Sequence, residues 1–412
     1  MEDWVREHMA SAEELAKLGL CDRCLGRMFG KLGTGMTNDV RGRMLRDALE
    51  AEGKPVNEPD FCQLCENVFT MAERFATEIA DKVNSVESDN FLVGCRVDPE
   101  ILAREKEIWE RHGIVTGESI KTELNREIGK KVLPRVNRAV EFKQPQVVAC
   151  IDTRFADVSL DVAPVFIAGR YNKLSREIPQ TVWPCRDCRG KGCDRCGGTG
   201  KMYQTSVQEI IGDIALEMSG GKEHFFHGMG REDIDACMLG DGRPFVLEIG
   251  EPRIRDIDLD ELERRANASE LAKYGNLHFV PRNVVQLYKG ADPDKVYRAT
   301  VRAQGKVNKE RVIEVALAFK NVQIEQRTPR RVEHRRADLV RKRTIRWVEA
   351  EVTGEDIFTL TLNAESGTYI KEFVSGDEGR TVPNFSDALG IPCRVEALDV
   401  LAIDYQEQSM RD

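Results

Sequence analysis

The sequence predicts a multidomain α+β protein. Its 412 residues exceed what one hydrophobic core usually holds, so two to four domains are expected. Segments with the apolar period of helices alternate with segments that have the two-residue period of strands. Eight of the twelve cysteines form four Cys-x-x-Cys pairs, which indicate metal sites rather than disulfides in a cytosolic chain.

The composition is that of a polar globular protein. Charged residues make up 32% and aromatic residues 7% of the chain, and the net charge is −9. No apolar run approaches the roughly 20 residues that span a bilayer, and the acidic, amphipathic start is unlike a signal peptide. We expect a cytoplasmic protein without membrane contact. The net charge argues mildly against a nucleic-acid partner, but the distribution of charge matters more.

Residues 1–66 are predicted to form a zinc-binding module. A Cys-x-x-Cys turn aims two sulfurs at one point, and a second turn completes a tetrahedral shell. A helical apolar face lies between the two turns, and the alternative is a pair of reduced turns without metal. The predicted ligands are Cys21, Cys24, Cys62 and Cys65.

Residues 67–168 are predicted to form a small α+β domain. An apolar helical face from Val68 to Val83 comes first, and the strand "NFLVGCRV" follows it. A second helix is expected to end near Gly129. The stretch 145–169 is predicted to form two strands around a polar turn.

Residues 169–412 are predicted to be strand-rich α+β, with a cysteine-rich insert at 185–200. The insert has two tandem Cys-x-x-Cys-x-Gly-x-Gly units, whose glycines permit sharp turns. It is a candidate second zinc site, or else a flexible loop, and four thiolates would make it structural because they leave no open position for water. The candidate ligands are Cys185, Cys188, Cys193 and Cys196.

The rest of this region is predicted from capping and periodicity. Ser206 and Glu209 form a capping box that starts a helix, which Gly220 ends. "FVLEI" is predicted to be a strand after the turn "DGRP". The other predicted elements are a helix in "LDELERRAN", a strand in "KVYRATV", a helix then a strand in "ERVIEVALAFKNVQIEQ", and an alternating strand in "DIFTLTLNAESGTYIKEFV".

A basic segment interrupts this otherwise acidic chain. Nine basic residues face two acidic ones, which favours a polyanion-binding surface over a solvated arginine-rich face. The basic residues are Arg327, Arg330, Arg331, Arg335, Arg336, Arg341, Lys342, Arg343 and Arg346.

Several reaction classes lack their signatures. The sequence has no phosphate loop, dinucleotide-binding glycine motif, His-Glu-x-x-His helix or nucleophile elbow. The remaining possibility is catalysis in which a carboxylate acts as an acid, a base or a nucleophile. The stretch "GREDIDACMLGDGRPF" offers Glu232, Asp233 and Asp235 for this role.

Four motifs now carry a resemblance to a known family. "GRYNKLSREIPQT", "GREDIDACMLGDGRPFVLEI", "RTPRRVEHRRADLVRKR" and "GTYIKEFVSGDEGRTVPN" occur in this order. Together they resemble the archaeal tRNA pseudouridine synthases that act on the T arm, and the resemblance spans nearly the whole chain. Residues 67–168 are similar to THUMP domains, which bind RNA, although an unrelated α+β domain is the alternative.

The resemblance implies a pseudouridine synthase fold, with a mixed, mostly antiparallel sheet, helices and a central cleft. It implies isomerisation of uridines 54 and 55 of the T loop without a catalytic cofactor. It also implies a grip on the T arm and elbow of tRNA, and no obligate protein partner. The alternatives are a non-catalytic zinc-ribbon tRNA-binding protein and a THUMP-containing enzyme of other chemistry.

The family places its catalytic aspartate in a Gly-Arg-x-Asp turn, which implies that Asp233 is catalytic. Asp235 is the rival, with capping or binding of Arg243 as its other role. Glu232 is expected to be exposed. Arg231 of the same turn is a candidate substrate-binding residue.

Four further residues are implied to bind the substrate. Tyr297 would hold the uracil, and Lys371, expected at a strand end beside Asp233, would keep that carboxylate ionised, with Ile370 packed nearby. Leu398 would line the pocket. Core positions for the tyrosine and the leucine, and a surface position for the lysine, are the alternatives. Where relatives often carry arginine this chain has Cys237, which would leave bracing of the loop to Arg231 or Arg243.

Overall fold

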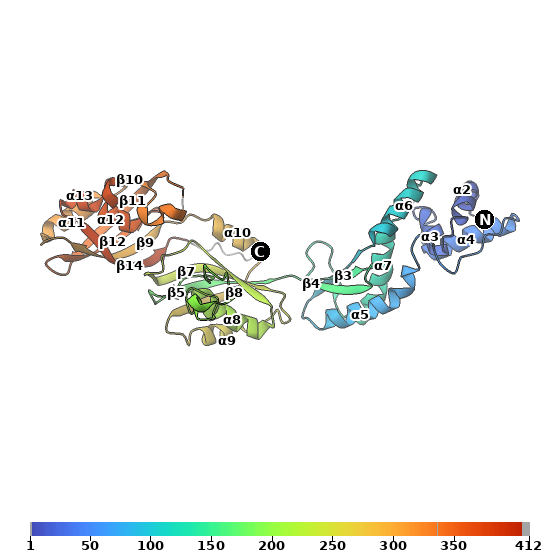
Figure 1. Cartoon of the computed structure of the whole chain (residues 1–412), viewed down its shortest axis with the longest axis horizontal. Coiled ribbons are helices and arrows are strands. Elements are labelled where there is room, and N and C mark those ends of the chain that lie inside the picture. Colours follow the sequence, from blue (N-terminus) through green and yellow to red (C-terminus); the bar gives the residue numbers. More distant parts are fainter. Residues whose placement is uncertain (1, 336, 406–412) are drawn as a thin grey trace. The chain divides into compact units, whose positions relative to one another are not determined.

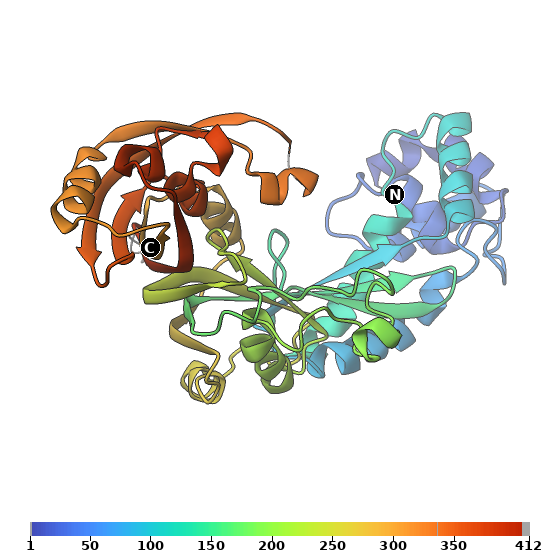
Figure 2. The same cartoon turned by 60° about the vertical axis from the view of Figure 1, so that its left-hand side comes forward.

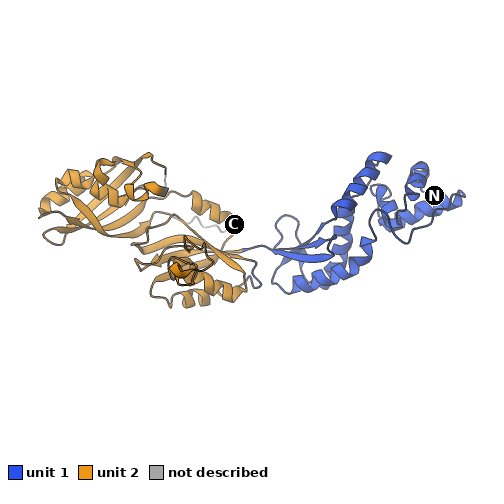
Figure 3. Ribbon diagram, in the orientation of Figure 1, with its two compact units in different colours: residues 1–164, 251–255 blue, residues 165–250, 256–412 orange. Residues whose placement is uncertain are grey.

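The computed structural model describes residues 2–335 and 337–405, although the side chain of Arg335 is not described. The chain divides into two compact units, coloured in Figure 3, of residues 1–164 with 251–255 and residues 165–250 with 256–412. Each unit has its own sheet, helices and hydrophobic core, which confirms the predicted α+β class. Within the described residues, no helix has the length and apolar character needed to cross a membrane.

The first unit begins with short helices around the first two Cys-x-x-Cys turns. In both views these helices, coloured blue, lie beside the cyan helices of the same unit (Figures 1 and 2). One continuous core joins them, from Val5 to Val162. The elements are α1 (Asp3–Glu7), α2 (Met9–Ala16), α3 (Asp22–Met28), α4 (Asn38–Ala51), η1 (Val68–Met71), α5 (Ala72–Asn84), β1 (Asn90–Arg96), α6 (Pro99–His112), α7 (Ile120–Val132), η2 (Leu133–Arg135), β2 (Ala139–Val140), β3 (Val147–Asp152) and β4 (Asp157–Val162).

The sheet of the first unit has the order β2-β1-β3-β4. β1 is parallel to β2 and β3, and β4 closes an antiparallel hairpin with β3. The predicted apolar face of α5 is buried, as expected. α7 ends at Val132, close to the predicted end near Gly129, whereas α6 was not predicted and the stretch 145–169 enters a third strand, β5, besides the two that were predicted.

The second unit is built around one large sheet. Figure 1 labels most of its strands and the longer helices that accompany them. The elements are β5 (Val165–Lys173), η3 (Asp194–Cys196), α8 (Val207–Ser219), β6 (Glu223–Gly228), β7 (Ala236–Gly250), α9 (Leu259–Ala266), β8 (Ala272–Phe279), α10 (Asn283–Gly290), β9 (Lys295–Ala303), α11 (Lys309–Ala318), β10 (Val322–Arg327), η4 (Arg330–Arg335), β11 (Val340–Val352), β12 (Ile357–Ala364), α12 (Ile370–Ser375), η5 (Asp377–Gly379), β13 (Thr381–Val382), α13 (Phe385–Leu389) and β14 (Cys393–Ile403).

The large sheet is mixed and mostly antiparallel, as predicted. Its strand order is β13-β10-β11-β12-β9-β14-β7-β5-β8, and β6 pairs with β7. In the middle, β14 runs parallel to β7 and antiparallel to β9. The start of β7 therefore lies beside β14, a strand that comes much later in the chain, and β9 is one strand further away.

β7 is longer than predicted, because it begins at Ala236 rather than after a turn at "DGRP". Glycines let the strand continue through this stretch. Gly240 has φ +60°, and a Cβ there would lie 2.0 Å from the carbonyl oxygen of Leu401. The turn expected from sequence is thus an irregular part of the strand that begins directly after the acidic loop.

Local predictions from capping and alternation are confirmed. The Ser206 hydroxyl accepts a hydrogen bond from the backbone N–H of Glu209 and donates to its carboxylate, so α8 begins as predicted. Gly220, with φ 62°, ends it. β12 buries the side chains of Phe358, Leu360 and Leu362, as its alternation indicated.

Candidate active site

The loop between β6 and β7, residues 229–235, forms one wall of a cavity of about 280 Å³. The other walls come from β9, β14, η4 and the start of α12, which are far apart in sequence. The cavity brings together all the residues predicted to be catalytic or to bind substrate, namely Asp233, Arg231, Tyr297, Ile370, Lys371 and Leu398.

Strand register builds the floor of this cavity. Leu398 of β14 lies opposite Ala236 at the start of β7, and Val400 lies opposite Tyr297 of β9. Side chains two residues apart on a strand share a face, so these residues all face the cavity. Burial raises the pKa of Tyr297 to about 12, so its hydroxyl is protonated at neutral pH.

Asp233 stands at the open side of the cavity, with 37% of its side chain exposed. Its carboxylate accepts a hydrogen bond of 2.8 Å from the guanidinium of Arg331. The same guanidinium donates to Glu372 at 2.7 Å. Burial opposes the charge of Arg331, but these two carboxylates raise its pKa, so it stays a cation. Two elements, η4 and α12, therefore fix the direction of the Asp233 carboxylate.

Glu232 is buried, which corrects the expectation that it is exposed. Its carboxylate accepts a hydrogen bond from the Tyr171 hydroxyl at 2.9 Å and forms a salt bridge of 2.9 Å with Arg243. Only 1% of the Arg243 side chain is exposed. Burial lowers the pKa of Arg243, but Glu232 raises it overall, so Arg243 stays a cation. Arg243 binds Glu232 and not Asp235, the partner that had been considered for it.

Buried donors also hold the backbone of the loop. Arg243 donates to the Met229 carbonyl at 2.8 Å, and Gln180 donates to the Gly230 carbonyl at 3.0 Å. The ammonium of Lys173, which is completely buried, donates to the carbonyls of residues 233 and 234 at 3.2 and 2.7 Å. Because buried donors hydrogen-bond four carbonyls of the loop, its backbone is held rigidly around Asp233.

Lys371 lies in the first turn of α12, not at a strand end. Its ammonium donates to the Asp235 carboxylate at 2.7 Å, whereas Asp233 is bonded to Arg331. Burial raises the pKa of Asp235, but Lys371 lowers it overall. Lys371 thus lines the cavity and connects the end of the loop to α12. The cation beside Asp233 was expected to be Lys371, but it is Arg331.

Arg231 is exposed, and its guanidinium lies 5.6 Å from the ring centre of Trp183. Cys237 is buried and its thiol donates a long hydrogen bond, 3.6 Å, to the Leu174 carbonyl. Arg176, which the sequence analysis did not single out, donates to the carbonyls of Asp235 at 3.0 Å and Leu398 at 2.9 Å. Arg243 and Arg176 therefore brace the loop, whereas Arg231 is an exposed residue at the cavity.

Lys295 is a second residue that was not predicted. It lines the cavity, and its ammonium donates to Ser366 at 2.9 Å and to the Pro293 carbonyl at 3.0 Å. Burial lowers its pKa to about 8. The sequence around a lysine at the start of a strand does not indicate that it lines a cavity, because only the fold brings Ser366 and the loop 229–235 beside it.

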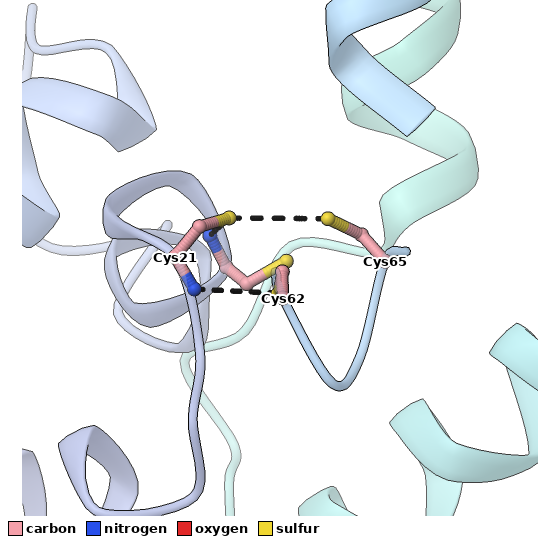
Figure 4. Close-up of side chains that lie close together, drawn as sticks. Cys21, Cys62 and Cys65 are labelled. Carbon is pink, nitrogen blue, oxygen red and sulfur yellow. Dashed lines mark hydrogen bonds between the residues drawn. The ribbon is translucent and has the colours of Figure 1, made fainter. Parts of the chain in front are cut away.

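The first four cysteines meet at one point. Figure 4 shows the sulfur of Cys21 facing that of Cys65, 3.8 Å away, and the backbone N–H of Cys21 donating to Cys62 at 3.3 Å. One sulfur from each of the four cysteines lies within 4.8 Å of the others. Arg27 donates to the sulfur of Cys24, and backbone and guanidinium donors of this kind support thiolates. The donor set fits a structural metal ion.

The second four cysteines also converge, within the same 4.8 Å limit. Backbone N–H groups of Gly192 and Gly200 donate to the sulfurs of Cys188 and Cys196, each at 3.2 Å. All twelve cysteines are free thiols. This cluster is more exposed than the first, and its four sulfurs could likewise hold an ion.

The basic segment is partly neutralised within the molecule. Arg327 pairs with Asp338, and Arg346 with Asp294 at 2.7 Å. Arg331 belongs to the cavity. Arg336 and the side chain of Arg335 lie outside the described residues, so their predicted part in a polyanion surface remains a prediction.

Two family models match this chain. The model described as Pus10, C-terminal, matches residues 166–404, and that described as Pus10 THUMP domain, archaeal, matches residues 75–152. The C-terminal match contains every residue around the cavity.

Known relatives match over nearly the full length. A tRNA pseudouridine synthase Pus10 from Methanothermobacter marburgensis is 42% identical, covering 97% of this chain and 98% of the relative. One from Pyrococcus furiosus is 40% identical, covering 95% and 96%. A solved Cbf5-Nop10-Gar1 complex has 16% identity over 48% of this chain and 45% of that chain. Its TM-score is 0.30, too low to support an argument.

Proposed function

The chain belongs to the Pus10 family, and we propose that it is a tRNA pseudouridine synthase that isomerises uridines 54 and 55 of the T loop, with Asp233 as the catalytic carboxylate. The observation that carries the proposal is the position of Asp233. Among the three acids of its loop, Asp233 alone lines the cavity with a partly exposed carboxylate. Glu232 also lines the cavity, but its carboxylate is buried in an ion pair with Arg243, and Asp235 bonds Lys371.

The reaction is a rearrangement within one nucleoside. The bond from N1 of uracil to C1′ of the ribose breaks, the base turns, and a bond from C5 to C1′ forms. The C5 proton leaves and N1 gains one, so atoms balance without a cofactor. In this proposal Asp233 acts as nucleophile or base at the ribose. The cavity of about 280 Å³ suits one flipped-out nucleoside.

The remaining cavity residues support this role. Arg331 orients the Asp233 carboxylate, and Tyr297 with Leu398 gives the loosened uracil an apolar surface to pack on. The Tyr297 hydroxyl is protonated and can donate to the base or relay its proton. Lys371 and Ile370 form the edge where α12 meets the substrate.

The division of labour along the chain is part of the proposal. Residues 1–66 form a zinc-binding module, residues 67–168 an RNA-binding domain, and residues 169–412 the catalytic domain. The match of the archaeal THUMP model within the second of these supports a grip on the tRNA T arm and elbow. We assign zinc to the first cysteine cluster and leave the second as a further zinc candidate. Free thiols throughout are consistent with a cytoplasmic protein.

A cofactor-free assay tests the proposal. An unmodified tRNA transcript is incubated with the protein, and pseudouridine is mapped by carbodiimide treatment and primer extension. We expect stops at positions 54 and 55, and transcripts with cytidine at either position separate the two activities. Tight tRNA binding without pseudouridine would instead support the non-catalytic binding protein, and would overturn the proposal.

A further inference from the structure

The second cysteine cluster belongs to a small projection that we call the knuckle, residues 185–200. Its two ends are paired: Pro184 bridges to Lys201, and the N–H of Cys185 donates to the Gly200 carbonyl at 2.7 Å. Lys201 also pairs with Glu209 in the first turn of α8. The knuckle is therefore fixed at its base to the catalytic unit.

The base of the knuckle touches the catalytic loop. Trp183 precedes the knuckle, and its ring packs edge-on against Tyr203 after it, with 5.7 Å between ring centres. The ring of Trp183 also lies 5.6 Å from the guanidinium of Arg231, two residues before Asp233. Arg231 itself lines the catalytic cavity. The knuckle consequently stands next to the rim of the cavity on the Arg231 side.

The knuckle carries cations that have no internal role. Arg186, Arg189 and Lys191 are exposed, and among the described residues their side chains have no hydrogen bond or ion pair. By contrast, the guanidinium of Arg195 is paired with Asp187 at 2.9 Å. Arg231 also lacks a carboxylate partner within the described part of the chain. Unpaired cations at this density leave their charge available for an external anion.

We propose that Arg186, Arg189 and Lys191 bind the phosphodiester backbone of the RNA next to the target uridine. This inference rests on the proposed function, because it needs an RNA substrate at the cavity. A flipped nucleoside enters the cavity, but the phosphates of its neighbours stay outside at the rim. Arg231 meets the nearest phosphates, and the three knuckle cations extend the basic track from there. The cysteine cluster keeps the knuckle rigid, so that the track has a fixed direction.

The test neutralises the three cations together. In Arg186→Gln/Arg189→Gln/Lys191→Gln, we expect the Kd for full-length tRNA transcript to rise about tenfold at moderate salt. The slope of log K against log salt should fall by about two, since each lost phosphate contact removes roughly 0.7 to 0.9. The variant should make pseudouridine more slowly than wild type at low tRNA concentration, and at the wild-type rate when tRNA is saturating. Bound metal per chain and circular dichroism should match wild type, because all three side chains are exposed.

A matched variant controls for lost charge as such. Lys306, Lys309 and Lys320 are exposed in the same unit and do not line the cavity. Their replacement by glutamine removes the same charge and should change Kd by less than twofold. A knuckle variant that binds tRNA as tightly as wild type with the same salt slope, or no more weakly than the control variant, would overturn the inference. If wild type makes no pseudouridine, the proposed function is wrong. If wild type makes pseudouridine but the knuckle variant binds tRNA normally, only the further inference is wrong.

Discussion

Replacing Glu232 with glutamine should destabilise the catalytic unit strongly, although the residue sits in a polar loop. The glutamine keeps the size of the side chain but removes the charge that balances Arg243. That guanidinium is only 1% exposed, so water cannot replace the lost partner. Breaking a buried ion pair on one side costs about 3–5 kcal/mol, and the retained amide oxygen puts the cost near the lower end, about 3 kcal/mol.

Urea unfolding of the full chain measures this cost. With a slope of about 2 kcal/mol per molar urea, the midpoint for the catalytic unit should fall by roughly 1–2 M. Glu396→Gln is the matched control, since Glu396 bonds Arg302 at the surface and exposed pairs contribute about 0–1 kcal/mol. If the two variants unfold at the same urea concentration, Glu232 does not support the loop as described.

Other predictions concern the cavity and the metal sites. Arg331→Gln should lower the single-turnover rate constant about ten- to hundredfold. The reason is that the hydrogen bond between the charged groups of Arg331 and Asp233 orients the carboxylate and is worth about 1.5–3 kcal/mol. Arg331→Lys should recover part of the lost rate. Burial lowers the pKa of Lys295 to about 8, so the unfolded chain holds more protons between pH 8 and about 10.5, and stability must rise with pH there. Between pH 8 and about 10.5, the free energy of unfolding of wild type in urea should rise by up to about 3 kcal/mol more than that of Lys295→Met. If the free energy of unfolding depends on pH in the same way in both proteins, the ammonium of Lys295 is not buried as described. Cys62→Ser should reduce bound zinc, measured by elemental analysis, and lower the melting temperature of the first unit, whereas Cys185→Ser should leave that unit unchanged.

Local patterns in the sequence predicted local structure well. The capping box of Ser206 placed the start of α8, and the alternation from Ile357 onward placed the buried face of β12. Both depend only on neighbouring residues. The pattern around Lys371 failed because the strand alternation stops at Ala364, and α12 begins only six residues later.

The residues of the candidate site that stand in family motifs were predicted, and those placed there only by contacts between distant segments were missed. The Gly-Arg-x-Asp frame singled out Asp233, which the structure places at the cavity. Glu232 is buried because Tyr171, from another strand, closes over it, and no local signal reports this. Arg331 reaches Asp233 from 98 residues away, and its place in the basic segment predicted only a part in binding RNA. Long-range pairings of this kind come from the sheet order, which the sequence did not predict.

Two neighbouring aspartates give the most direct test of the central claim. Asp233→Asn and Asp235→Asn make the same chemical change within one loop, and each residue has one cationic partner. On unmodified tRNA transcript, Asp233→Asn should form no pseudouridine at either T-loop position while still binding tRNA. Asp235→Asn should keep activity within about fivefold of wild type, because 66% of the Asp235 side chain is exposed and ion pairs of exposed carboxylates contribute little. Pseudouridine formed by Asp233→Asn, or a complete loss confined to Asp235→Asn, would contradict the account.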